Sequence, residues 1–243
     1  MTTGTDARSG LVAAGLWTLV EFAFRAFLIV VVGGIVLAPR FLRGSAVEDR
    51  FLGAAVVGTL ALTLSTLFLI FRGRVARERL RLDDLGYRFD RHRILAGFAS
   101  GLFLLFLLWG TSHVDLALFP EGAKSFEALL RLLAEAGPVV AAGMLLANGI
   151  LAPLVEEFAW RGYIQYRLMR AWGTWAGLAG TALLFALKHM IVDASVGRIT
   201  TLLVGACALG LIRQRWGTAA STAAHLTANF VATFYLLTTA LRN

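Results

Sequence analysis

Two adjacent glutamates, Glu156 and Glu157, lie within one apolar run of the chain. Two later apolar segments each contain a histidine, His189 in the first and His225 in the second, and Asn229 follows four positions after His225. An ionised side chain near the middle of a bilayer costs at least ~2.5–3.5 kcal/mol, so membrane chains rarely retain one without a use. Carboxylates, imidazoles and a carboxamide are the groups that activate a water and stabilise an oxyanion.

The two glutamates are expected to have different roles. Glu157 and Arg161 are four positions apart with the acid first, which is the favourable order for an ion pair on a helix. Glu156 points about 100° away from that face and has no basic partner on its own helix. A desolvated carboxylate without a counter-charge suits general base or acid work. We therefore assign the chemistry to Glu156 and a supporting role to Glu157 and Arg161; the alternative is that both acids only fasten helices together.

Helix geometry places His189 at the depth of Glu156. Glu156 precedes Trp172 by 16 positions and His189 follows Gly173 by 16 positions, so a hairpin that turns there brings both to a similar level. Pairing at depth with an unpartnered carboxylate favours a functional histidine over one that only packs. Asp193, one turn beyond His189, either orients the imidazole or marks the end of the span.

His225 and Asn229 share one helical face. Together they can donate hydrogen bonds to an oxyanion, as the stabilisation of a tetrahedral intermediate requires. Their alternative role is hydrogen bonding between helices, which contributes on average only ~0.6 kcal/mol per bond. No Gly-x-Ser-x-Gly or His-Glu-x-x-His sequence occurs, and the single cysteine, Cys207, has no histidine near it in the sequence. Serine or cysteine nucleophiles are therefore not supported.

The composition predicts the fold that must position these groups. The chain has 243 residues, of which 58% are hydrophobic, and a mean hydropathy of +0.73, so it belongs among multi-span membrane proteins. We expect an all-α polytopic bundle, a single integral-membrane domain over 1–243 with its catalytic core at about 137–241. An amphipathic interfacial helix at 120–136, either an anchor or a lid, raises the helix number to about seven to eight. The predicted spans lie near 11–38, 51–71, 94–119, 137–166, 173–194, 199–213 and 218–241.

Charge sets the expected topology. The net charge is +8, but the arginines lie mostly in loops between apolar runs, which is typical of the positive-inside pattern and not of nucleic-acid binding. The strongest basic run, from 72 to 93, predicts a cytoplasmic loop and a cytoplasmic N-terminus. Within the first span, Glu21 and Arg25 are expected to neutralise each other.

The motif order resembles that of the CAAX-processing and bacteriocin-processing (CPBP, or Abi) intramembrane proteases. Glu-Glu-x-x-x-Arg begins at Glu156, Phe-x-x-x-His ends at His189, and His-x-x-x-Asn runs from His225 to Asn229. The resemblance implies a helical bundle around a polar cavity open towards the cytosol. It also implies that Glu156 and His189 activate the water while His225 and Asn229 stabilise the oxyanion.

The resemblance leaves two mechanisms open. Members of the family are widely described as metalloproteases, and a glutamate-activated water without metal has also been argued for them. If a zinc is bound, Glu156, His189 and His225 could supply its three protein ligands, with water in the fourth position. Lys188, beside His189, would repel a cation if it faced the cavity, and we expect it to point elsewhere.

The leading hypothesis is an intramembrane endopeptidase in the plasma membrane of a prokaryote, with membrane lipids and a peptide, lipidated peptide or membrane-protein substrate as partners. A second is a non-catalytic membrane protein for bacteriocin self-immunity or scaffolding. A third is a small transporter with Glu156 as a proton carrier, which the lack of an inverted repeat disfavours. The sequence specifies neither a physiological substrate nor an oligomeric state.

Overall fold

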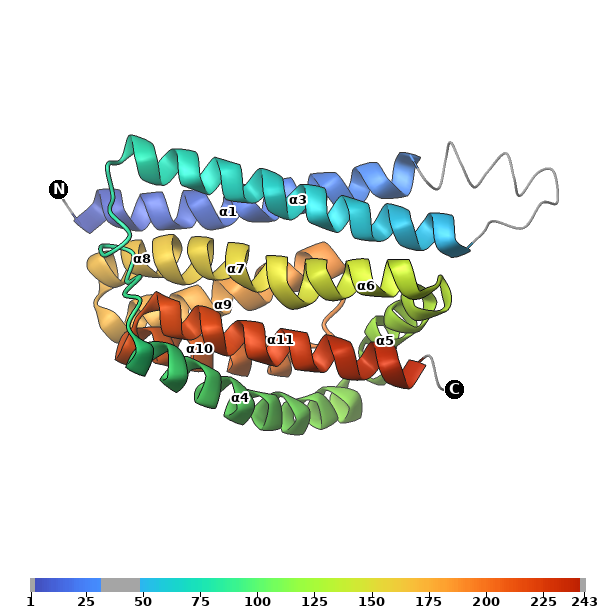
Figure 1. The fold of residues 1–243 in the computed structure, drawn as a ribbon. Helices are drawn as coiled ribbons and strands as arrows, with labels where there is room; N and C mark the ends of the chain where they lie inside the picture. The colour runs from blue at the N-terminus through green and yellow to red at the C-terminus, as the bar shows by residue number, and fades with distance from the viewer. Residues whose placement is uncertain (1–2, 32–48, 241–243) are drawn as a thin grey trace.

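The structure, a computed structural model, describes residues 3–31 and 49–240, and all the regular secondary structure in them is helical (Figure 1). Those residues contain no strand, so the predicted all-α class is confirmed. The elements in order are α1 (Thr3–Leu28), α3 (Asp49–Arg77), α4 (Arg91–Leu118), α5 (Pro120–Glu135), α6 (Pro138–Leu146), η2 (Ala147–Leu151), α7 (Ala152–Glu156), η3 (Glu157–Ile164), α8 (Gln165–Trp172), α9 (Thr174–Asp193), α10 (Ile199–Trp216) and α11 (Thr218–Ala240).

Among the described residues, five helical segments are long and apolar enough to cross a membrane, which supports an integral membrane protein. They are Gly4–Val31, Arg50–Arg77, Arg91–Leu118, Pro138–Trp172 and Thr174–Asp193. The predicted spans at 199–213 and 218–241 form the helices α10 and α11, which are outside this set. Part of the first predicted span, 32–38, lies outside the described residues. The predicted interfacial helix at 120–136 is α5, and its role as anchor or lid stays a prediction.

The basic segments meet at one end of the bundle. Figure 1 shows the start of α1, the end of α3, the start of α4 and the end of α8 together at the left of the view. The guanidinium of Arg93 in α4 lies 3.4 Å from the carbonyl oxygen of Trp216, so the end of α10 is there too. We call this the basic end. The topology therefore gathers the segments that were expected on one side of the membrane, whereas their cytoplasmic placement stays a prediction.

A partly buried polar network ties α1, α3, η3 and α8 together at the basic end. Glu78, directly after α3, accepts a 2.6 Å hydrogen bond from the hydroxyl of Tyr163 in η3 and lies 3.3 Å from Arg74 Nε. Arg167 in α8 contacts both Glu78 and Asp6 of α1. Burial by itself raises the pKa of Glu78, but the hydrogen bonds from Tyr163 and Arg167 and the charges of both arginines outweigh it. The pKa of Glu78 is thereby held below its usual value.

Stability in detergent is expected to fall in acid because of this carboxylate. A group whose pKa is lowered by folding stabilises the fold above its unfolded pKa, about 4.3 for Glu, and loses that contribution as the pH falls through the folded value. The thermal midpoint should therefore decline below about pH 4. Glu78→Gln should lower the midpoint at neutral pH and flatten this acid decline; an unchanged acid decline in the variant would contradict the assignment.

Glycines let α4 approach α11, the helix that contains His225. A Cβ added at Gly97 would lie 2.4 Å from the carbonyl oxygen of Ala220, and one at Gly101 would lie 2.7 Å from that of Ala224. Such separations are below van der Waals contact, so side chains there would push the helices apart. The close packing of α4 therefore fixes the position of α11 beside the site.

Gly97→Ala is expected to lower the thermal midpoint in detergent because its methyl group meets the α11 backbone. The matched control is Gly110→Ala on the same helix, where nothing lies within 4 Å of the added Cβ. Alanine is favoured over glycine inside a helix by about 1 kcal/mol, so the control should be neutral or stabilising. Equal midpoint losses in the two variants would show that α4 and α11 do not pack this closely.

Candidate active site

Glu156 and Glu157 lie where a long helix departs from α-helical geometry. The run from α6 to α8 is continuous, but η2 and η3 are π-helical and lie on either side of α7. Pro153 in α7 has no N–H to bond the preceding turn, so it disturbs the helix locally. The wider π turns rotate the following side chains relative to a 3.6-residue repeat, and such turns are frequent at functional sites. Hydrophobic spacing does not predict these turns, and Pro153 is the one signal for them in the sequence.

Glu156 meets both histidines inside the bundle. Its Oε1 lies 3.9 Å from His189 Nε2 on α9, and its Oε2 lies 4.0 Å from His225 Nε2 on α11. Glu156 and His225 are both buried. These gaps are too long for direct hydrogen bonds and are of the width that a bridging water fills. The structure thus brings the three groups together: His189 lies beside Glu156, in keeping with their similar predicted depth, and His225 joins them from α11.

Each imidazole has a carboxylate at its other nitrogen. His225 Nδ1 lies 3.0 Å from Glu157 Oε1, and His189 Nδ1 lies 3.6 Å from Asp193 Oδ2. The Glu157 carboxylate is within hydrogen-bond distance, so it favours the proton on Nδ1 of His225 and turns Nε2 towards Glu156, whereas the contact at His189 is longer than a hydrogen bond. Asp193 is both the last residue of α9 and the partner of His189, so the two roles considered for it are compatible.

Glu157 and Arg161 form the predicted ion pair. Arg161 Nη1 lies 3.3 Å from Glu157 Oε1, and the two side chains are 1% and 0% exposed. The guanidinium also lies 4.6 Å from the ring centre of Phe185, a cation–π distance. Glu157 therefore contacts both the buried guanidinium and the His225 imidazole, while its supporting role stays a prediction.

Lys188 supplies the counter-charge that Glu156 was expected to lack. Its Nζ lies 2.9 Å from Glu156 Oε1 and 3.0 Å from Glu21 Oε2 of α1, and its side chain is 1% exposed. The expectation that Lys188 points away is wrong, and so is the pairing of Glu21 with Arg25, because Arg25 pairs with Asp193 at 2.8 Å. Spacing along the sequence reveals partners on the same helix only, whereas these ion pairs join different packed helices.

Asn229 makes a hydrogen bond between helices. Its Nδ2 donates to the carbonyl oxygen of Asn148 in η2 at 3.2 Å, and the Asn148 side chain donates to Thr233 Oγ1 of α11 at 2.8 Å. The alternative considered for Asn229 therefore describes its contact here. A carboxamide has two N–H donors, so one remains for a substrate oxygen and the oxyanion role stays a prediction.

The side chains as arranged do not fit a three-ligand zinc site. Within the residues that the structure describes, no group of three or more His, Cys, Asp or Glu side chains is spaced to hold a metal ion. Zinc bonds of 2.0–2.2 Å place neighbouring ligand atoms roughly 3.3 Å apart, whereas Glu156 lies 3.9 and 4.0 Å from the imidazole nitrogens. The ammonium of Lys188 on Glu156 also opposes a divalent cation.

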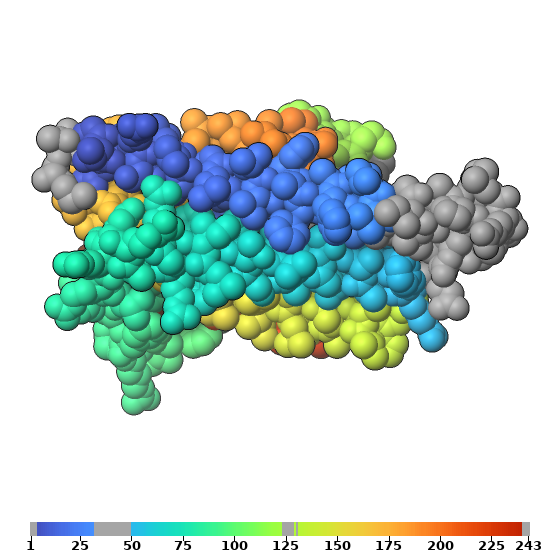
Figure 2. All heavy atoms as spheres, turned by 90° about the horizontal axis from the view of Figure 1, so that it is seen from above, coloured from blue at the N-terminus to red at the C-terminus, as the bar shows by residue number. Residues whose placement is uncertain are grey.

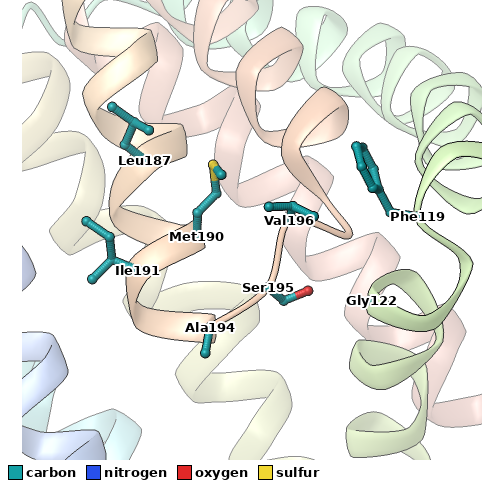
Figure 3. A pocket seen from close by; sticks show the side chains of 8 residues that line it. All are labelled: Phe119, Gly122, Leu187, Met190, Ile191, Ala194, Ser195 and Val196. Atoms are coloured by element: carbon teal, nitrogen blue, oxygen red, sulfur yellow. The ribbon is translucent and has the colours of Figure 1, made fainter.

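A pocket of about 640 Å³ lies near the end of α9, and Figure 3 shows the side chains around it. Its walls are mainly apolar, and its lining residues come from the ends of α4 and α9 and the residues just after them, away from the basic end. None of the candidate catalytic side chains lines it, so it is not the expected polar cavity. The lining residues are Phe119, Gly122, Leu187, Met190, Ile191, Ala194, Ser195 and Val196.

The candidate catalytic residues all fall in one segment with a recognisable family pattern. Residues 138–231 match the family model Rce1-like, described as type II CAAX prenyl endopeptidase Rce1-like. The predicted family resemblance is confirmed. The matched segment begins at α6 and ends within α11, so α1, α3, α4 and α5 lie outside it. No curated protein and no solved structure matches the chain.

Proposed function

We propose that this protein is an intramembrane endopeptidase that hydrolyses a peptide bond with a water activated by Glu156. The observation that supports this most is the meeting of one buried carboxylate with two imidazole Nε2 atoms, at 3.9 and 4.0 Å, inside a segment that matches a CAAX endopeptidase family. A water between these groups contacts both a base and a hydrogen-bonding partner.

In the proposed reaction, Glu156 with His189 takes a proton from the water while the water oxygen attacks the peptide carbonyl carbon. The carbonyl oxygen becomes an oxyanion and accepts hydrogen bonds from His225 and from the second N–H of Asn229. To donate from Nε2, His225 must be protonated on both nitrogens, and the Glu157 carboxylate at 3.0 Å compensates that charge. The proton then passes from Glu156 to the leaving amine as the C–N bond breaks.

The wider context is part of the same proposal. The chain forms one integral-membrane domain of about seven to eight helices around a polar site, with its catalytic core at about 137–241 and its N-terminus in the cytoplasm of a prokaryote. The substrate is a membrane-associated or lipidated peptide or protein. A prenylated CAAX peptide is the first to test, because the family description names that class. The donor atoms around Glu156 are too widely spaced for zinc, so the proposed reaction uses a water without a metal.

One observation favours a non-catalytic alternative. The ammonium of Lys188 lies 2.9 Å from the carboxylate that must act as base, and a fully neutralised carboxylate is a poor base. A protein that binds a bacteriocin or scaffolds a complex without cutting needs no reactive base. In that case, a folded wild-type protein binds peptides and cleaves none.

The test is cleavage of a fluorogenic library of free and prenylated peptides by the wild-type protein in nanodiscs. Metal content is read from the same samples, and Glu156→Ala serves as the inactive control. Cleavage that is lost in the control supports the proposal, with stoichiometric zinc indicating a metalloprotease and its lack a metal-free reaction. Equal cleavage by both proteins would remove Glu156 from the mechanism, and no cleavage by a folded wild type would favour the non-catalytic alternative.

A further inference from the structure

Lys188 is shared by two carboxylates from different helices. Its Nζ lies 2.9 Å from Glu156 of α7 and 3.0 Å from Glu21 of α1. Trp17, one turn before Glu21, donates from Nε1 to the same Glu21 oxygen at 2.7 Å, and the ammonium lies 5.4 Å from the Trp17 ring centre. Two aromatic faces therefore line the ammonium, because the ring of Phe185 lies 5.2 Å away. The ammonium of Lys188 is therefore fixed by two carboxylates and two aromatic rings.

The charges of this group leave Glu156 only partly compensated. One ammonium between two ionised carboxylates leaves a net charge of −1, so neither acid is fully neutralised. Lys188 contacts Oε1 of Glu156, the oxygen that lies 3.9 Å from His189 Nε2, whereas Oε2 lies 4.0 Å from His225 Nε2. The ammonium therefore fixes the orientation of the carboxylate and leaves Oε2, and the second lone pair of Oε1 beside His189, to accept a hydrogen bond from a water. If Lys188 paired with Glu156 alone, the ammonium would neutralise that carboxylate fully, and Glu156 would be a weaker base.

We propose that Lys188 and Glu21 are positioning residues of the active site: Lys188 holds the Glu156 carboxylate in place, and Glu21 shares the ammonium so that Glu156 stays reactive. This inference rests on the proposed function. It extends the site beyond the matched segment, because α1 precedes residue 138. Figure 2 shows α1 and α3 side by side on one face of the bundle, with α9 emerging beyond α1. On this proposal, α1 contributes Glu21 to the active site in addition to packing against it.

The first test is Glu21→Gln. The amide oxygen of Gln can still accept the Trp17 hydrogen bond, so the change removes the charge and keeps the shape. We expect kcat to fall about tenfold with KM unchanged, because only the reactivity of the base changes. Glu21→Asp keeps the charge and should recover kcat to within about threefold of wild type. An unchanged kcat in Glu21→Gln would overturn the proposal.

A matched control separates this effect from a general loss of stability. Asp6 is also a buried acid on α1, but it pairs with Arg167 at the basic end, 15 residues or about 22 Å from Glu21 along the helix. Asp6→Asn should lower the thermal midpoint and leave kcat of the folded protein unchanged. A tenfold fall in kcat for Asp6→Asn would mean that any loss on α1 lowers activity, and would overturn the proposal.

The second test combines the change with Lys188→Met. If Glu21 acts on Glu156 only through Lys188, the effect of Glu21→Gln on kcat disappears in the Lys188→Met background. If the effects of the two substitutions on kcat are additive, Glu21 does not act on Glu156 through Lys188, and the proposal is overturned. The thermal midpoint provides a second reading that needs no cleavage: Glu21→Gln should lower it by several degrees in the wild type and not in Lys188→Met.

The two readings distinguish failure of this inference from failure of the proposed function. Suppose that the wild type cleaves no peptide, but that Glu21→Gln lowers the thermal midpoint only when Lys188 is present. This result would refute the protease function and still show that Glu21 and Glu156 share the Lys188 ammonium. Equal midpoint losses in both backgrounds would refute the shared ammonium whether or not the protein cleaves. If Lys188→Met does not fold, the comparison of Glu21→Gln with Glu21→Asp decides.

Discussion

Glu156→Gln is expected to lower kcat by about 10²–10⁴-fold, the usual contribution of a positioned general base. An amide cannot accept the proton of the attacking water or return it to the leaving amine. Its oxygen can still accept from Lys188, which lies 2.9 Å from the carboxylate it replaces. KM should change little because the shape of the site is kept, and the measurement is steady-state cleavage of the best library peptide in nanodiscs.

The fold of this variant should survive for an electrostatic reason. Lys188 keeps Glu21 as an ionised partner at 3.0 Å, so the substitution leaves a neutral pair and no unpaired charge. The matched control is Glu135→Gln, the same change at an exposed position at the end of α5, which should retain wild-type cleavage. More than a tenth of wild-type kcat in a folded Glu156→Gln variant would exclude Glu156 as the base.

The sequence predicts best what depends on one helix or on helix length. The all-helical class, the Glu157–Arg161 pair and the Gly173 turn follow from local spacing, and the similar depth of Glu156 and His189 follows from their equal distances from that turn. Each of these needs only a constant rise per residue and a known turn position. For this reason they could be stated before any packing was known.

Contacts across packed helices could not be stated in this way. Lys188 reaches Glu156 and Glu21 because α1, α7 and α9 pack together, and spacing along one helix contains no information about that packing. The same holds for Asn229, whose side chain bonds to Asn148 on a neighbouring element. The π-helical turns around α7 also alter which face each side chain occupies, so a 3.6-residue projection is least reliable at the site itself.

Glu157→Leu is expected to destabilise the fold strongly. Arg161 is 1% exposed, and the substitution leaves its guanidinium buried without a carboxylate. Breaking a buried ion pair in this way costs about 3–5 kcal/mol, so the thermal midpoint in detergent should fall clearly. The double variant Glu157→Leu/Arg161→Met removes both charges together. Since apolar residues often replace a buried pair without loss, its midpoint should return towards wild type.

Recovered stability in the double variant should not bring recovered activity. Glu157 Oε1 is also the partner of His225 Nδ1, at 3.0 Å, and without it the imidazole loses the contact that fixes its proton and its orientation. Loss of an orienting carboxylate of this kind lowers activity by roughly 10²-fold or more. The Arg161→Met single variant provides the comparison, because Glu157 remains to hold His225 and most of the activity of the folded protein should remain. If the double variant is both stable and active, Glu157 is only a structural partner of Arg161, and His225 does not depend on it.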